Sequence, residues 1–206
     1  MNLKSLKILF QNVHKNTLII QTLLETQKDY DIILIQELPW SEIRKVLSPS
    51  NSEGDLLIGT SHHPNWIMFG RTPVDSNDLP RVISYVNIHL SPLRFLLHKD
   101  INLISFFNDN TYFFILNVYS DSSHTALNYL KDTEVNIDNV LIMTGNFNIR
   151  DCLWDPTFPH HSTISDNLFI IADSFNLSLS TATNPCPTRY SDMSGEANSV
   201  LDLMFL

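Results

Sequence analysis

The segment Val140-Leu-Ile-Met-Thr-Gly-Asn-Phe-Asn148 joins an apolar run to a glycine and two asparagines. An apolar run of this kind, followed by glycine, predicts a buried central strand over 140–144 and a turn at Gly145. In a layered α/β domain, the loops at the carboxyl ends of such strands gather polar residues around a ligand. The side-chain amides of Asn146 and Asn148 are therefore the first candidate functional groups.

The rest of the chain alternates between strand-like and helix-like segments. Residues 6–13, 17–27 and 32–35 predict a β-α-β opening, and three short β-rich segments at 56–59, 66–70 and 81–88, separated by turn signals, predict an antiparallel meander. Further predicted elements are a strand at 112–118, a helix at 125–131, a helix at 166–175 and a strand at 199–205. This order predicts an α/β protein with mixed sheets and helices outside them.

Length and composition set outer limits on the function. A chain of 206 residues with 43% hydrophobic residues can bury a full core, which predicts one globular domain over 1–206. Its net charge of −9 argues against capture of nucleic acid by the whole surface. A polyanionic substrate would need a metal ion or a local basic patch, for which Arg150 and Arg189 are the candidates.

The cysteines and the apolar runs predict the compartment. Cys152 and Cys186 lie far apart and do not form a metal-type pair, so we expect reduced thiols in an intracellular protein, nuclear or cytoplasmic. The N-terminus shows no secretory leader, and no apolar run is long enough to span a bilayer, so no membrane association is expected.

Polar residues stand where five predicted strands end or begin. They are Asn12, Glu37, Tyr119, the pair Asn146 and Asn148, and Asp202 with Ser199. Carboxylate and amide oxygens are hard ligands that suit Mg²⁺, with Mn²⁺ as the alternative, and the amides and the phenol can hold a phosphate. The histidine pairs, such as His160-His161, lack the helical spacing and the cysteine partner of a zinc site.

In order, the motifs Gln-Asn12, Gln-Glu37, Asn-Val-Tyr119, Gly-Asn146-Phe-Asn148 and Ser199-Val-Leu-Asp202 resemble the endonuclease/exonuclease/phosphatase superfamily. The resemblance covers nearly the whole chain. Together with flanking segments such as Pro187-Thr-Arg-Tyr190, it is most similar to the endonuclease domains of fungal non-LTR retrotransposons. It implies a four-layer sandwich of two mixed β-sheets flanked by helices, and metal-dependent phosphodiester hydrolysis with DNA as the partner.

The same resemblance implies a role for each motif residue. Glu37 would be the metal ligand, Tyr119 would bond the scissile phosphate, and Asn148 would hold that phosphate or the attacking water. Asp202 would support the site and orient its neighbours. Asn12, Arg150, Thr188 and Ser199 are expected to bind substrate.

Two departures from the family pattern limit the expected activity. The family has aspartate at the position of Asn146, where it orients and deprotonates the water, and an amide cannot accept that proton. The family also continues to a Ser-Asp-His motif on a final strand, whereas this chain stops at Leu206. We therefore expect a fold that lacks its last strand, an open sheet edge or a gap in the core, and impaired turnover.

Other interpretations remain for the same residues. Glu37 could begin a helix near Pro39, Asp202 could make a structural hydrogen bond, and Tyr119 could be a rim aromatic. Structural roles are also open for Asn12, Asn146, Asn148, Thr188, Ser199 and the arginines. At the level of function, the alternatives are a non-catalytic retroelement remnant that binds protein or nucleic acid, and a phosphatase or phosphodiesterase for a small molecule or lipid.

Overall fold

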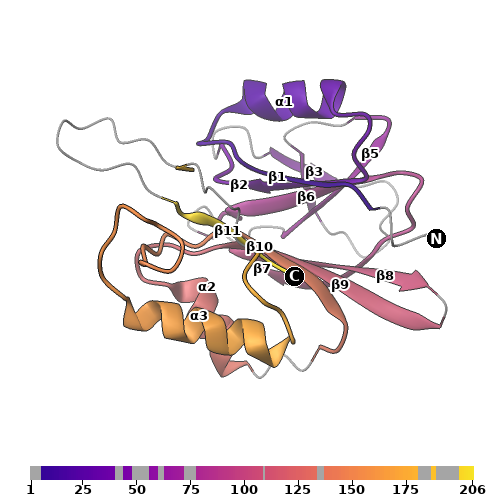
Figure 1. Cartoon of the computed structure of the whole chain (residues 1–206). Coiled ribbons are helices and arrows are strands. Elements are labelled where there is room, and N and C mark those ends of the chain that lie inside the picture. Colours follow the sequence, from indigo (N-terminus) through magenta and orange to yellow (C-terminus); the bar gives the residue numbers. More distant parts are fainter. Residues whose placement is uncertain are drawn as a thin grey trace.

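The computed structural model describes residues 6–39, 63–71, 78–108, 110–133, 137–180, 187–188 and 200–206, and for 44–47, 56–59, 94–97 and 108 it describes the backbone alone. The chain forms four layers, which follow one another from top to bottom in Figure 1. They are helix α1 (Thr17–Thr26), a four-stranded sheet, a five-stranded sheet, and helices α2 (Thr125–Asp132) and α3 (Thr163–Ser174). The predicted α/β sandwich of two mixed sheets flanked by helices is confirmed.

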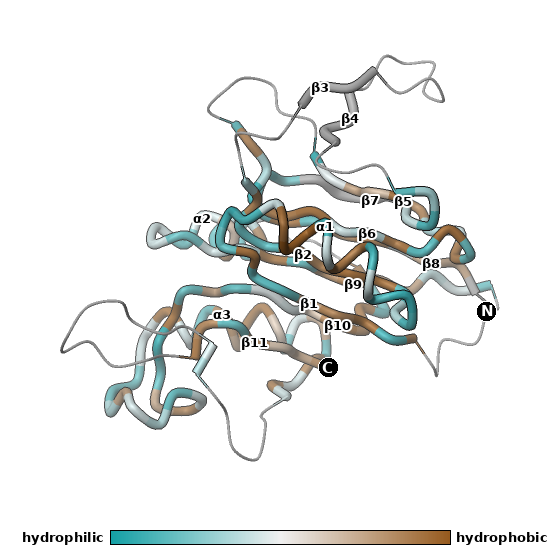
Figure 2. Tube along the Cα trace, turned by 90° about the horizontal axis from the view of Figure 1, so that it is seen from above, coloured by the Kyte–Doolittle hydropathy of each residue, from teal (hydrophilic) through white to brown (hydrophobic). Residues whose placement is uncertain are grey.

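The first sheet has the strand order β1-β2-β6-β5. Its strands are β1 (Ile8–Asn12), β2 (Ile32–Gln36), β5 (Trp66–Gly70) and β6 (Val82–Asn87). Strands β1 and β2 run parallel and are joined through α1, while β6 pairs antiparallel with both of its neighbours. In Figure 2, α1 lies over these strands, whose central tubes are largely hydrophobic.

Asn16 caps the N-terminus of helix α1, and one apolar face of the helix packs against the first sheet. The Asn16 Oδ1 accepts hydrogen bonds from the N–H groups of Leu18 and Ile19, which satisfies donors that the first turn leaves free. Ile20 and Leu24, four residues apart, are the buried residues of the helix. They pack in one cluster with residues such as Ile33 of β2.

The second sheet has the order β11-β10-β9-β8-β7. Its strands are β7 (Leu93–His98), β8 (Ile101–Asn108), β9 (Thr111–Tyr119), β10 (Val140–Asn146) and β11 (Asp202–Phe205). Strands β9 and β10 are parallel and the other pairs antiparallel. A separate antiparallel pair is formed by β3 (Arg44–Leu47) and β4 (Leu56–Gly59).

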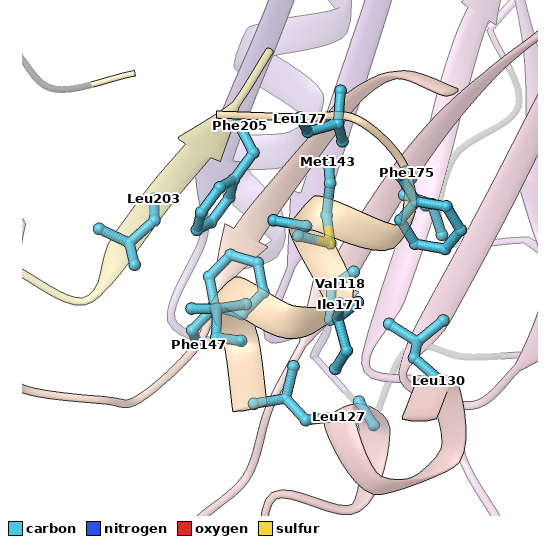
Figure 3. Packing of buried hydrophobic residues seen from close by; sticks show 14 of the residues in the cluster. Val118, Leu127, Leu130, Met143, Phe147, Ile171, Phe175, Leu177, Leu203 and Phe205 are labelled. Carbon is cyan, nitrogen blue, oxygen red and sulfur yellow. The ribbon is translucent and has the colours of Figure 1, made fainter. Parts of the chain in front are cut away.

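Helices α2 and α3 cover the outer face of the second sheet. Met143, Phe147 and Phe205 are fully buried beneath them, and Figure 3 shows these side chains gathered beside α3. The rings of Phe147 and Phe205 meet edge to face with centroids 5.9 Å apart, a favourable arrangement for aromatic pairs. Burial of each such side chain contributes roughly 1.5–3 kcal/mol.

The space between the sheets changes from apolar to polar along the strands. Ile32, Leu34 and Ile115 belong to its apolar part. Further along the same strands, Gln36 Nε2 donates to Asn117 Oδ1 at 2.6 Å, and Asn117 Nδ2 donates to the carbonyl oxygens of residues 35 and 83 at 3.2 and 2.9 Å. These bonds cross from one sheet to the other. They fix the two sheets against each other next to the strand ends that carry the candidate site.

Gly145 lies within β10 and not in a turn, which corrects the sequence prediction. Its φ is 154°, and a Cβ at this position would lie 1.8 Å from the carbonyl oxygen of Val118 on the parallel neighbour β9. Only glycine permits this close approach of the two backbones. The strand therefore continues to Asn146, and the irregular loop starts one residue later.

Two other predictions about the sheets are wrong. The three β-rich segments do not form one meander, because β5 pairs with β6 whereas β4 pairs with β3. The expected open edge beside β11 is instead covered by the segment 178–180, whose backbone bonds to residues 204 and 206 at 2.8–2.9 Å. Among the described helices, none is long and apolar enough to cross a bilayer.

Candidate functional site

The fold brings the strand-end residues to one edge of the paired sheets. Asn12 ends β1, Glu37 directly follows β2, and Tyr119 and Asn146 end the parallel strands β9 and β10. Asn146 lies opposite Tyr119 on one side and opposite Asp202 on the other. The expectation that these side chains share one edge is therefore met, and their individual contacts show what each can do.

Asn12 and Glu37 form a hydrogen-bonded pair across β1 and β2. The Asn12 Nδ2 donates to Glu37 Oε1 at 2.8 Å, and Asn12 Oδ1 accepts from the N–H of His14 at 3.0 Å. Glu37 has a left-handed φ of 54°, which is uncommon for this residue type, and its carbonyl accepts from the N–H of Lys15 at 2.8 Å. Its Oε2 has His14 Nδ1 3.5 Å away. Glu37 thus holds its carboxylate at the strand end and does not begin a helix.

Tyr119 is half-buried and is contacted from two sides. Burial, followed by the negative charge of Glu37, raises the pKa of its phenol, while Arg81 and a hydrogen bond with Asn148 act in the opposite direction. The phenol therefore stays protonated at neutral pH and can donate a hydrogen bond. The Arg81 guanidinium lies over the Tyr119 ring, 4.9 Å from its centroid.

Arg81 is the residue at this edge that the sequence did not single out. It pairs with the fully buried carboxylate of Asp100 through Nε and Nη2, and its Nη2 also donates to Asp121 Oδ2 at 3.1 Å. Burial alone would lower its pKa, but the hydrogen bonds and charge of Asp100 raise it. Arg81, Asp100 and Asp121 come from segments far apart in the sequence, so no local sequence pattern predicts their contact.

Asn146 and Asn148 build a short turn after β10. The buried Asn146 uses Oδ1 to accept the N–H of Asn148 at 3.0 Å, and Asn148 Nδ2 donates to the carbonyl of Ser120 at 2.6 Å. Asn148 has a left-handed φ of 51°, which asparagine tolerates better than most residues. The amide at position 146 thus directs its acceptor toward its own loop.

Asp202 is the most perturbed carboxyl group at this edge. Its Oδ1 is buried and has no hydrogen-bond partner in the described part of the structure. Burial and then the charge of Glu37 raise the pKa of Asp202 to about 6, against the opposing effects of Thr188 and His14. A buried carboxyl group with a raised pKa next to a second acid is a candidate functional group.

Three solved structures share this architecture. The endonuclease domain of TRAS1, a telomere-specific non-LTR retrotransposon, gives a TM-score of 0.64 at 15% identity, covering 98% of this chain and 84% of that one. An endonuclease/exonuclease/phosphatase family protein from Leptotrichia buccalis gives 0.55 at 13%, covering 98% and 87%. A beta toxin variant from Staphylococcus aureus, solved with bound magnesium ions, gives 0.50 at 10%, covering 97% and 83%.

The chain has the endonuclease/exonuclease/phosphatase fold. No family model matches its sequence, and no curated protein is detectably similar to it, so the likeness rests on the arrangement of the chain. At these identities the comparison shows the fold alone. The roles of individual residues depend on the geometry described above.

The other residues predicted to bind substrate or phosphate differ in their contacts. Arg150 donates from Nε to Asp155 Oδ2 and from Nη2 to Thr157 Oγ1, each at 3.1 Å, and lies over the Phe158 ring. Thr188 Oγ1 accepts the N–H groups of residues 201 and 202 at 2.8 and 3.1 Å. Ser199 and Arg189 lie outside the described residues.

A hollow of about 480 Å³ opens beside Asn148 in the endonuclease/exonuclease/phosphatase fold of this chain. Its lining includes Arg150, His124, Phe158 and His161. Arg150 therefore faces a space next to the candidate site, although its guanidinium is already engaged by Asp155. The hollow could receive part of a substrate that extends beyond the strand ends.

The donor set at the strand ends suits Mg²⁺. Glu37 Oε2 is a hard oxygen donor, and so is Asp202 Oδ1, which has no hydrogen-bond partner among the described residues. The negative charge of Glu37 contributes to the raised pKa of Asp202. Asn12 contributes by holding the Glu37 carboxylate in place. The residues present therefore fit a divalent cation with oxygen ligands.

Proposed function

We propose that this chain is a metal-dependent phosphodiester hydrolase of the DNA endonuclease type whose turnover is limited by Asn146. The observation that carries the proposal is the meeting of four residues at one edge of the two sheets, namely Glu37, Tyr119, Asn148 and Asp202, whose Oδ1 has no partner among the residues that the structure describes. The likeness to the TRAS1 endonuclease domain and the ordered retroelement-like motifs favour DNA as the substrate, and the location that goes with this proposal is intracellular, nuclear or cytoplasmic.

Glu37 is the proposed principal ligand of Mg²⁺, and Asp202 is the second acid. Such a cation, when bound, stabilises negative charge on a phosphate. Asn12 orients Glu37 through the 2.8 Å hydrogen bond to Oε1, and Oε2 is the oxygen that does not take part in this bond. The protein thus presents an acid of fixed orientation at the place where the phosphate must bind.

Tyr119 and Asn148 are the proposed phosphate contacts. The phenol keeps its proton because its pKa is raised, so it can donate to a phosphate oxygen. Arg81, which Asp100 and Asp121 hold in place, packs over the ring and so helps to position the phenol. Asn146 lacks a group that can take a proton from water, and loss of a general base costs about 10² to 10⁴ in rate.

A second candidate function is binding of a nucleic acid without turnover. The observation that favours it is the Asn146 Oδ1, which accepts the Asn148 N–H and so serves the turn. In this case Arg150, Tyr119 and Asn148 would hold the phosphate backbone. Its affinity would fall steeply with salt, as expected for contacts with phosphates.

The test is nicking of supercoiled plasmid in Mg²⁺ by the unmodified chain and by Glu37→Gln. The matched control is Glu25→Gln, an exposed glutamate on α1. Slow nicking that disappears in Glu37→Gln and persists in Glu25→Gln supports hydrolysis at this site. Plasmid that is bound but never cut supports the second candidate. Hydrolysis of bis(p-nitrophenyl) phosphate or of phospholipid vesicles without plasmid cleavage would replace DNA by a small-molecule or lipid substrate.

A further inference from the structure

The loop between β10 and α3 gathers three different metal-ligating groups away from the strand-end carboxylates. Ligand atoms of Asp151, Cys152 and His161 all lie within 4.8 Å of one another. Cys152 is exposed and the His161 ring is 47% exposed, so both can be reached from solvent, whereas Asp151 is fully buried. The sequence analysis found no cysteine partner for His160-His161, but the structure brings Cys152, nine positions from His161 in an irregular loop, to that histidine.

Carboxylates contact both ring nitrogens of His161 and so fix the orientation of its ring. The His161 Nδ1 lies 2.8 Å from Asp151 Oδ2, and Nε2 lies 2.9 Å from Asp166 Oδ1 in the first turn of α3. When the Nε2 proton is directed to Asp166, deprotonated Nδ1 is the ligand-forming nitrogen. A carboxylate behind the distal nitrogen is the usual second partner of a metal-bound histidine.

The carboxylate of the cluster is held rigidly. Asp151 Oδ1 accepts from the N–H of Leu153 at 2.9 Å, and Oδ2 accepts from the N–H of Ser162 at 2.8 Å and from Ser165 Oγ at 2.6 Å. These bonds fix Asp151 before any ion arrives, so that little ordering is needed on binding. The backbone N–H of Cys152 also donates to the carbonyl of residue 160 at 3.1 Å, which keeps the two ends of the loop together.

We propose that Asp151, Cys152 and His161 form a site for one thiophilic divalent cation of the zinc class, separate from the oxygen-ligand edge. A thiolate, an imidazole and a carboxylate select zinc-class ions over Mg²⁺. Zinc takes such ligands at about 2.0–2.3 Å, which places the ligand atoms of a tetrahedron about 3.3–3.6 Å apart. Atoms at the 4.8 Å limit must therefore close by roughly 1 Å, and water completes the tetrahedron. Binding releases the proton of the Cys152 thiol and the proton that Nδ1 carries when His161 is cationic.

A cation at this site would join Asp151 and Cys152 to His161 within the loop and fix the His161 ring. That ring also lines the hollow beside Asn148. The site would therefore stiffen the wall of the hollow without supplying a group to the strand-end carboxylates. Without a cation, the same contacts form an ion pair in which a protonated His161 bridges Asp151 and Asp166.

The test is titration of the reduced full chain with Co²⁺, followed by displacement with Zn²⁺ in excess Mg²⁺. We expect one equivalent of Co²⁺ with a thiolate-to-cobalt charge-transfer band that Zn²⁺ removes and Mg²⁺ does not. The band should vanish in Cys152→Ser, and affinity should fall at least about tenfold in His161→Gln. Cys186→Ser should keep the band, which assigns it to Cys152.

The melting temperature with Zn²⁺ and the cobalt band of Cys152→Ser decide whether the site exists. Zn²⁺ should raise the Tm of the unmodified chain but not that of Cys152→Ser, a substitution at an exposed side chain that leaves the fold intact. The absence of a thiolate band, or a band that persists in Cys152→Ser, overturns the site and leaves only the ion pair. Neither result depends on nuclease activity, so failure here is distinct from failure of the proposed hydrolase function.

Discussion

Asp151 accepts hydrogen bonds from the N–H groups of Leu153 and Ser162 and from the Ser165 hydroxyl, whereas Oδ1 of Asp202 has no partner in the described structure. Burial alone would raise the pKa of both acids. The hydrogen bonds hold the pKa of Asp151 below its ordinary value, while the pKa of Asp202 rises to about 6. The two buried acids therefore differ in hydrogen bonding, and their pKa values shift in opposite directions.

The difference separates a carboxylate that the protein itself satisfies with hydrogen bonds from one that keeps an oxygen without a partner among the described residues. A buried charge that is fully hydrogen-bonded organises its neighbours, and Asp151 does so for the loop that leads into α3. A buried charge without donors costs stability and is retained where a ligand completes it. Asp202 is closer to the second kind, because its Oδ1 has no partner in the described part of the structure, although a hydrogen bond with Thr188 opposes the rise of its pKa.

The largest expected effect is the loss of the Asp151 carboxylate. In Asp151→Ala the donors of Leu153, Ser162 and Ser165 lose their acceptor, and we expect the free energy of unfolding to fall by about 3 kcal/mol. Urea denaturation measures this. Asp173→Ala, at an exposed site on α3, should change it by less than about 0.5 kcal/mol. A loss below about 1 kcal/mol in Asp151→Ala would remove the contrast with Asp202.

Asp202→Asn should show the opposite behaviour and depend on pH. The pKa of Asp202 is raised from 3.8 to about 6, so the folded protein binds this proton more tightly than the unfolded chain. The stabilisation from this group is full below about pH 4 and is lost as the pH rises through 6, by about 2–3 kcal/mol in all. Asparagine does not titrate, so Asp202→Asn should become more stable relative to the unmodified chain over this range.

Urea denaturation between about pH 4 and 7 measures that difference. Asp173→Asn serves as the control, because an exposed acid should give a nearly flat difference over the same range. If Asp202→Asn tracks the unmodified chain at every pH, then Asp202 is satisfied in solution and the comparison fails.

The smallest effect is expected for Arg150, which lies between the two regions. Arg150 pairs with Asp155 at 3.1 Å, and the arginine side chain is partly exposed whereas Asp155 is buried. When Arg150 is replaced, Asp155 still accepts two hydrogen bonds from Thr157. Arg150→Met should therefore cost about 1 kcal/mol or less in unfolding free energy. A thermal melt suffices to detect it. A loss above about 2 kcal/mol would place Arg150 with the structural groups and argue against its proposed phosphate contact.

The sequence predicted the parts of the site that follow strand patterns. Glu37, Tyr119 and Asn146 stand directly at the ends of apolar strands, and parallel strands bring such ends together. The four-layer arrangement followed from the family resemblance and not from periodicity. Gly145 was misassigned because a glycine after an apolar run signals a turn, whereas the need here is close approach to Val118.

What the sequence missed depends on tertiary contact. Arg81 meets Asp100 and Asp121 only after three strands and a loop have assembled, and none of the three has a recognisable local motif. Cys152 and His161 are likewise joined by a loop without periodicity. The hairpin of β7 and β8 was overlooked although its strands run over 93–98 and 101–108, because its short turn carries no glycine and its strands mix polar with apolar residues.

The central claim is that the strand-end residues form a hydrolytic site in which Asn146 stands where a base is needed. The most direct measurement is the rate of Mg²⁺-dependent plasmid nicking by Asn146→Asp relative to the unmodified chain, with Asn176→Asp as the matched control at an exposed turn. We predict an increase of about 10² or more for Asn146→Asp and none for Asn176→Asp. A folded Asn146→Asp protein that nicks no faster than the unmodified chain would contradict the account.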